Sequence, residues 1–169
     1  MYMRTLTIIL AVFLLQIRGF AQTNAEQKLA AAGLKLPQTS KPLANYVKWV
    51  KTGNLVFTAG HGSELKGVLG KTLTTEQGYD AARQTGLQLL ATLKDAIGDL
   101  EKVKRIVKIT GFVMCADDFT DQPKVINGIS DLMVLVFGEN GKHARTAVGT
   151  NALPNGIALE IEMVVELRD

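Results

Sequence analysis

The longest regular pattern of apolar positions lies between Thr75 and Ile97. Apolar or small side chains recur there every three or four residues, at Tyr79, Ala82, Gly86, Leu89, Leu90, Leu93 and Ile97. This spacing places them on one face of an α-helix. The segment therefore predicts a long amphipathic helix, which ends at Gly98 because glycine readily takes the positive φ of a helix C-terminus.

Two further helices are predicted. One runs from Val125 to Phe137, with Pro123 near its first turn and Gly138 just beyond its end. A shorter one covers Ala25 to Leu34 and stops before Pro37, since proline has a fixed φ and no N–H to donate. Residues 39–42 follow as a linker.

Strict alternation of apolar and other residues predicts the last strand, Ala158 to Leu167. β-Branched and aromatic residues predict the other strands, at Asn45–Lys51, Leu55–Ala59, Val103–Cys115 and Arg145–Thr150. The first two strands form a hairpin through Thr52-Gly53-Asn54. Residues 60–70 hold four glycines and predict a loop with a short strand.

The order β-β-α-β-α-β-β indicates an α+β domain whose two long helices cover one face of the sheet. The other face is not fully polar. Alternation along Val103–Cys115 places Ile106, Phe112 and Met114 on one side and Val107, Ile109 and Val113 on the other. Because large exposed apolar patches are uncommon on monomers, this predicts association with other copies of the chain.

The N-terminus has the pattern of a secretory signal peptide. Arg4 is followed by an apolar run of 13 residues, Thr5 to Ile17, and small residues precede a cut after Ala21. The run is too short for a membrane span of about 20 residues. We therefore expect residues 1–21 to be removed, residues 22–42 to form a helix and linker, and residues 43–169 to form the domain. The mature protein is expected in a periplasm or outside the cell, free of the membrane.

Charge and cysteine content exclude other classes of function. Removing residues 1–21 lowers the count of Lys and Arg from 19 to 17, against 16 Asp and Glu. A net charge of +1 offers little attraction for nucleic acid. Cys115 is the only cysteine, so no disulfide can form within the chain.

Motifs for nucleotide binding, for serine or metal hydrolysis and for paired cysteines are absent from the sequence. His61, His143 and Cys115 come from distant segments, so no metal site is expected, and both histidines are interpreted as polar loop residues. Arg145, which opens a strand after a glycine-containing turn, can offer two parallel hydrogen bonds to a carboxylate. A surface ion pair with an acid explains it equally well.

Several segments carry a resemblance to a known family. His143 to Glu162 contains Ala-Arg, then Leu-Pro, then Glu-Ile-Glu. Asn45-Tyr46-Val47, residues 53–60 and residues 119–128 agree in order and spacing. Together they cover residues 43–167. The chain resembles the Rid family of reactive intermediate deaminases, also known as endoribonuclease L-PSP or chorismate mutase-like proteins, and its longer subgroup with His-Ala-Arg.

This resemblance implies a chorismate mutase-like fold, assembled as a homotrimer with sites in the clefts between subunits and requiring no cofactor. It implies that Arg145 holds a substrate carboxylate and that Glu160 orients or activates water. It also implies that Tyr46 and Asn127 line the cleft and that backbone near Gly60 contributes hydrogen bonds. Ordinary alternatives remain: a solvated strand carboxylate for Glu160, packing for Tyr46 and a tight loop for Gly60.

Two positions depart from the compact enzymes of the family. Asn45 stands where they often have proline, and Ala147 where they often have cysteine. The leading hypothesis is a hydrolase of the 2-iminobutanoate/2-iminopropanoate deaminase type, which converts 2-imino acids or enamines to 2-oxo acids and ammonia. The alternative is a non-catalytic trimer that binds a small carboxylate metabolite. Ribonuclease activity ranks third, since export and near-neutral charge argue against RNA.

Overall fold

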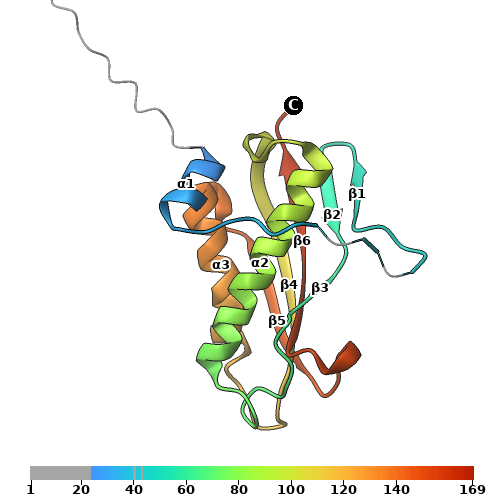
Figure 1. Cartoon of the computed structure of the whole chain (residues 1–169), viewed down its shortest axis with the longest axis vertical. Helices are drawn as coiled ribbons and strands as arrows, with labels where there is room; N and C mark the ends of the chain where they lie inside the picture. Colours follow the sequence, from blue (N-terminus) through green and yellow to red (C-terminus); the bar gives the residue numbers. More distant parts are fainter. Residues whose placement is uncertain (1–23, 40, 43) are drawn as a thin grey trace, which may run out of the picture.

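The computed structural model describes residues 24–39, 41–42 and 44–169 (Figure 1). The predicted signal peptide and its cleavage site lie outside these residues. The helices and strands are α1 (Ala25–Ala31), β1 (Trp49–Thr52), β2 (Leu55–Thr58), β3 (His61–Gly62), α2 (Thr75–Ile97), β4 (Val103–Met114), α3 (Gln122–Phe137), β5 (Ala144–Thr150) and β6 (Leu159–Leu167). Short 3₁₀ turns lie at Leu100–Lys102, Gly138–Gly141 and Pro154–Gly156. This succession confirms the predicted order of strands and helices.

The sheet has the strand order β1-β2-β6-β4-β5, and β3 pairs with β6 as well. The β4–β5 pair is parallel and all other pairs are antiparallel, so the sheet is mixed. The last strand of the chain therefore lies at the centre. Its alternating pattern is confirmed, since Leu159, Ile161, Met163, Val165 and Leu167 are all buried.

Both long helices lie side by side on one face of the sheet, as predicted (Figure 1). Helix α2 begins with a capping box, in which Thr74 and Gln77 each accept a hydrogen bond from the other's backbone N–H. It ends at Gly98, whose φ is 81°. Local signals thus define both ends of the helix that covers the core.

The core lies between this helix pair and the sheet. Its largest fully buried side chains come from α2, α3, β4 and β6 and include Leu89, Leu90, Leu93, Ile106, Ile109, Ile126, Ile129, Met133 and Leu159. Removing one such Leu or Ile side chain typically costs about 2–5 kcal/mol. Packing, rather than any covalent link, accounts for stability.

The predicted split of β4 into two sides is wrong at Ile106. Ile106 and Ile109 are both fully buried, although they are three residues apart. The pairing of β4 with β6 shifts by one residue between Ile106 and Lys108, which is a β-bulge. A bulge inserts one extra residue and so reverses the alternation beyond it. Ile106 therefore joins Ile109 and Val113 on the helix side, while Phe112 lies on the other.

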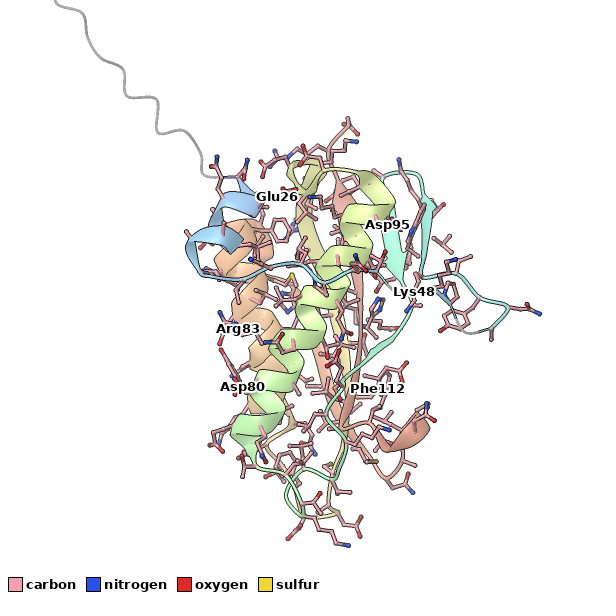
Figure 2. All side chains as sticks on the ribbon, in the orientation of Figure 1. Glu26, Lys48, Asp80, Arg83, Asp95 and Phe112 are labelled. Atoms are coloured by element: carbon pink, nitrogen blue, oxygen red, sulfur yellow. The ribbon has the colours of Figure 1, made fainter. Side chains whose placement is uncertain are left out.

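The face of the sheet away from the helices carries exposed apolar side chains. Phe57, Phe112 and Val148 are 41%, 38% and 42% exposed. Figure 2 shows Phe112 on the side of the sheet opposite α2 and α3. We call Val50, Phe57, Phe112, Val148 and Val164 the open face; strand pairing places them on one side of the sheet.

The N-terminal segment runs across α2 toward the start of β1 (Figure 1). The Ala25 N–H donates to Glu101 Oε1 at 2.7 Å, and Lys28 Nζ donates to the Val136 carbonyl at 3.1 Å. Leu34 and Leu36 pack against the core. These contacts hold α1 and residues 34–36 against the domain. Among the described residues, no helix has the length and apolar character that crossing a membrane requires.

Candidate functional site

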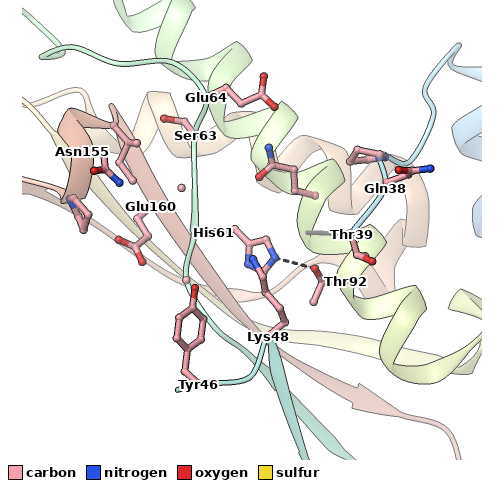
Figure 3. Close-up of a pocket in the computed structure, with 16 residues that line it drawn as sticks. Gln38, Thr39, Tyr46, Lys48, His61, Ser63, Glu64, Thr92, Asn155 and Glu160 are labelled. Atoms are coloured by element: carbon pink, nitrogen blue, oxygen red, sulfur yellow. Dashed lines mark hydrogen bonds between the residues drawn. The ribbon is translucent and has the colours of Figure 1, made fainter. Parts of the chain in front are cut away.

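A cavity of about 490 Å³ opens beside β3, between the N-terminal segment, the start of β1, helix α2 and the end of the turn before β6 (Figure 3). Most of its lining is polar. The polar side chains are Gln38, Thr39, Tyr46, Lys48, His61, Ser63, Glu64, Gln88, Thr92, Asn155 and Glu160. Three residues singled out from the sequence, Tyr46, Gly60 and Glu160, therefore meet in one place.

Position 60 requires a glycine because the Glu160 side chain lies against it, and not because the backbone turns there. Its φ is not positive. A Cβ at this position would lie 2.9 Å from Glu160 Cδ and in still closer contact with Oε1. The Glu160 carboxyl group thus rests on the Gly60 backbone, and any larger residue would displace it.

Tyr46 faces Glu160 across the cavity. Figure 3 shows its hydroxyl and the Glu160 carboxylate directed into the same space. Tyr46 is largely exposed, and the Glu160 side chain is half-buried. A phenolic hydroxyl and a carboxylate on opposite sides of a small ligand can share its polar groups.

His61 forms the floor of the cavity and is only 6% exposed. Its Nδ1 lies 3.0 Å from the Ala59 carbonyl and its Nε2 lies 2.8 Å from Thr92 Oγ1 (Figure 3). A carbonyl only accepts, so Nδ1 carries the proton, and the neutral ring accepts at Nε2 from Thr92. Burial lowers the pKa of His61 below 6.5, which favours this neutral form.

Arg145 lies on β5, at the opposite edge of the sheet from β1. Its Nη1 donates to Asn127 Oδ1 at 2.7 Å and to Ser130 Oγ at 3.0 Å, both on α3. Nη2 and Nε make no hydrogen bond to the described residues, so their N–H groups remain for a ligand. The guanidinium is exposed and held in one orientation, which suits a planar carboxylate.

His143 supports this arrangement from behind. Its Nδ1 lies 2.7 Å from the Gly141 carbonyl and its Nε2 lies 3.1 Å from Ser130 Oγ. The neutral ring therefore donates to Gly141 and accepts from the Ser130 hydroxyl, for which the Ile126 carbonyl is a second and longer acceptor at 3.4 Å. The Ser130 oxygen receives the Arg145 N–H. Burial lowers the pKa of His143, and the positive charge of Arg145 lowers it further.

One copy of the chain does not bring Arg145 and Glu160 together. Glu160 and Val148 both pair with Phe112, in one row across the sheet. Arg145 is three residues before Val148, so its side chain points to the helix side and that of Glu160 to the open face. From strand spacing, their Cα atoms are about 14 Å apart.

The site residues form two sets: Tyr46, Gly60 and Glu160 at the cavity, and Asn127 and Arg145 beside α3. Ser130 and Thr92 were not predicted from the sequence. The prediction of a polar loop residue is confirmed for His143, which precedes β5, and is wrong for His61, which lies on β3. The signal available in the sequence was that His143 lies only two residues before Arg145, close enough to support it. Within the described residues, no three His, Cys, Asp or Glu side chains are placed to hold a metal ion.

Comparisons with known proteins agree with this fold. Residues 26–167 match the family model described as "YjgF/chorismate mutase-like, putative endoribonuclease". Protein TCP17 of Trypanosoma cruzi is 43% identical over 156 residues, which cover 88% of this chain and 98% of that protein.

Solved structures give the same result. Atu1372 of Agrobacterium tumefaciens, a protein of unknown function, is 36% identical, with a TM-score of 0.80 over 85% of this chain and 92% of that one. The YjgF gene product of Escherichia coli is 27% identical, with a TM-score of 0.54 over 78% and 94%. The chorismate mutase-like α+β fold predicted from the sequence is confirmed.

Proposed function

The chain belongs to the YjgF/chorismate mutase-like family, and we propose that it hydrolyses 2-imino acids or their enamine tautomers to 2-oxo acids and ammonia. The observation that carries this proposal is the Arg145 guanidinium. Asn127 and Ser130 hold it in one orientation, while Nη2 and Nε make no hydrogen bond to the described residues. A carboxylate is the planar group that such a fork binds with two parallel hydrogen bonds.

In the proposed reaction, Arg145 binds the carboxylate of the substrate and Glu160 acts as the general base. Water attacks the imine carbon while Glu160 accepts one of its protons and passes it to the nitrogen, which gives a carbinolamine. Glu160 then takes the second proton from the new hydroxyl and passes it to the nitrogen as the C–N bond breaks, so that ammonia leaves. The oxygen of water becomes the oxo group of the product. Holding the carboxylate and the water in place supplies much of the acceleration, and the general base adds a factor of about 10² to 10⁴.

The reaction needs both sets of site residues at one ligand. Because one copy separates them, we propose that the cavity of one subunit receives Arg145 from the next, in a homotrimer. The open face supports this, since its apolar side chains are exposed in the isolated chain. Association buries them and closes the cavity against water.

A carboxylate-binding protein without turnover is the second candidate. The specific observation in its favour is that Asn45 and Ala147 replace residues common in the compact enzymes, next to Tyr46 and Arg145. The arrangement of Arg145, Asn127 and Ser130 serves binding with or without hydrolysis.

The test is to supply an amino acid and an amino-acid oxidase and to compare imine loss with the spontaneous rate. Arg145→Ala should abolish both acceleration and carboxylate binding, because a charge-assisted contact of about 1.5–3 kcal/mol is lost. Glu160→Gln should keep binding and lower turnover by about 10² to 10⁴. The matched controls are Arg83→Ala, half-buried on α2, and Glu162→Gln, exposed on β6.

Each result decides between the candidates. Acceleration by the unmodified protein supports the deaminase, whereas carboxylate binding without acceleration supports the binding protein. If Glu160→Gln hydrolyses imines at the full rate while Arg145→Ala does not, Glu160 is only a strand carboxylate and the water activation is wrong.

A further inference from the structure

Three carboxamide side chains line the cavity: Gln38 in the N-terminal segment, Gln88 on α2 and Asn155 in the turn Pro154–Gly156. In the part of the chain that the structure describes, none of the three makes a hydrogen bond. Figure 3 shows Asn155 beside Glu160, across the cavity from Thr92 on α2. Each amide offers two N–H donors and an acceptor oxygen.

Three of the other neutral polar side chains of the lining already have partners. Ser63 Oγ donates to the Leu65 carbonyl at 2.8 Å, and the Thr92 hydroxyl bonds to His61 Nε2. His61 uses both ring nitrogens.

The neutral side chains without a hydrogen-bond partner among the described residues are therefore the three carboxamides and the hydroxyls of Thr39 and Tyr46. Of these, Gln88 is half-buried and Asn155 lies beside Glu160.

The backbone at Asn155 shows how its amide is held. Its φ is 56°, the only positive φ at a non-glycine residue that the structure describes. Asparagine tolerates this left-handed conformation better than most residues, and glycine adopts it at no steric cost. Asn155→Gly therefore removes the amide while it leaves the turn intact, so the contribution of the side chain can be measured separately.

Charged groups on the lining narrow the choice of ligand. Glu64 and Glu160 repel a second carboxylate on the ligand, and Lys48 repels a cationic group. An apolar substituent would displace water from Gln88 and Asn155 without replacing its hydrogen bonds. A site that hydrogen-bonds a group of its ligand rejects analogues that leave the site's polar groups unpaired.

We propose that this cavity selects a carboxylate ligand whose substituent is polar and uncharged, such as a carboxamide or a hydroxyl group, through Gln88 and Asn155. This specificity rests on the proposed function only for the position of the ligand's carboxylate, at Arg145 of a neighbouring copy. The substituent then extends toward α2 and the turn before β6.

The experiment uses isosteric carboxylates that are stable in water: succinamate, 4-methylpentanoate and succinate. They end in an amide, an isopropyl group and a second carboxylate. Titration calorimetry on the purified protein should show succinamate binding about tenfold more tightly than either of the others, as expected for one to two added hydrogen bonds.

Gln88→Leu and Asn155→Gly should each remove most of the preference for succinamate over 4-methylpentanoate. Gln84→Leu is the matched control, because Gln84 lies one turn earlier on α2 and does not line this cavity; it should keep the preference. Equal binding of succinamate and 4-methylpentanoate by the unmodified protein overturns the specificity alone. If none of the three binds, both the specificity and the proposed carboxylate site are wrong.

Discussion

At the scale of single residues, Arg145 is held by Asn127 and Ser130 of α3. Ser130 accepts from its Nη1 and donates to the neutral His143 ring. Removing that hydroxyl leaves Arg145 with Asn127 as its one partner on α3. The cost should therefore appear in carboxylate binding and not in the chemical step.

Ser130→Ala should weaken carboxylate binding by about 3- to 30-fold, the value of one hydrogen bond that orients a charged group. In the imine assay KM should rise by that factor, while kcat changes little. Tyr79→Phe is the control, because it removes a hydrogen bond from α2 to Asp131 on α3 without touching Arg145. An unchanged KM would show that Ser130 does not position the guanidinium.

The two histidines make stability depend on pH. The pKa values of His61 and His143 are both lowered by burial in the folded chain. Below the unfolded value of 6.5, the unfolded chain binds protons that the folded chain does not. The free energy of unfolding should therefore fall as the pH drops from about 6.5 through the lowered pKa values.

Urea unfolding between pH 7.5 and 5.5 measures this effect. These are the only histidines of the chain, so the double variant His61→Gln, His143→Gln should lose the pH dependence in that range. Stability that rises as the pH falls would contradict the buried neutral state of both rings.

At the scale of elements, the close approach of α2 and α3 depends on Gly128. A Cβ there would lie 2.9 Å from the Tyr79 carbonyl carbon and 3.0 Å from the Arg83 nitrogen, both backbone atoms. At Gly86 the nearest atoms are the side-chain ends of Leu132 and Ile129, at 2.9 and 3.0 Å. Side chains can move and helix backbone cannot, so the two glycines should respond differently to substitution.

Gly128→Ala should lower the free energy of unfolding by about 1–3 kcal/mol, because α3 must move away from α2. Gly86→Ala should be nearly neutral, since the gain of about 1 kcal/mol in helix propensity offsets modest repacking. Thermal and urea unfolding of both variants checks the difference. A raised Tm for Gly128→Ala would mean that the helices are not in contact at this residue.

At the scale of the whole molecule, the proposed shared site requires association through the open face. Phe57→Glu places a charge among apolar side chains, so we expect it to convert trimers to monomers and to abolish imine hydrolysis. Leu135→Glu is the matched control: Leu135 is also exposed, at 40%, but lies on α3, on the other side of the sheet. Light scattering at micromolar concentration checks both. An unmodified protein that is monomeric there would refute the shared site.

The sequence by itself determined the order and type of the elements. Periodicity along Thr75–Ile97 and alternation along β6 are local, and Gly98 and Gly138 mark helix ends through a positive φ that other residues resist. These signals require no knowledge of neighbouring strands. The assignment of residues 1–21 as a signal peptide likewise rests on local pattern alone.

Only the tertiary structure decided which side chains face one another. The bulge after Ile106 reversed the alternation of β4, because register depends on the partner strand and not on the residues of one strand. The same dependence placed Arg145 and Glu160 on opposite sides of the sheet, although both belong to one continuous motif in the sequence. The tertiary structure also brought Thr92, Gln88 and Asn155 to one cavity. A cavity forms where separate segments meet, and the sequence of one segment does not specify which other segments it will contact.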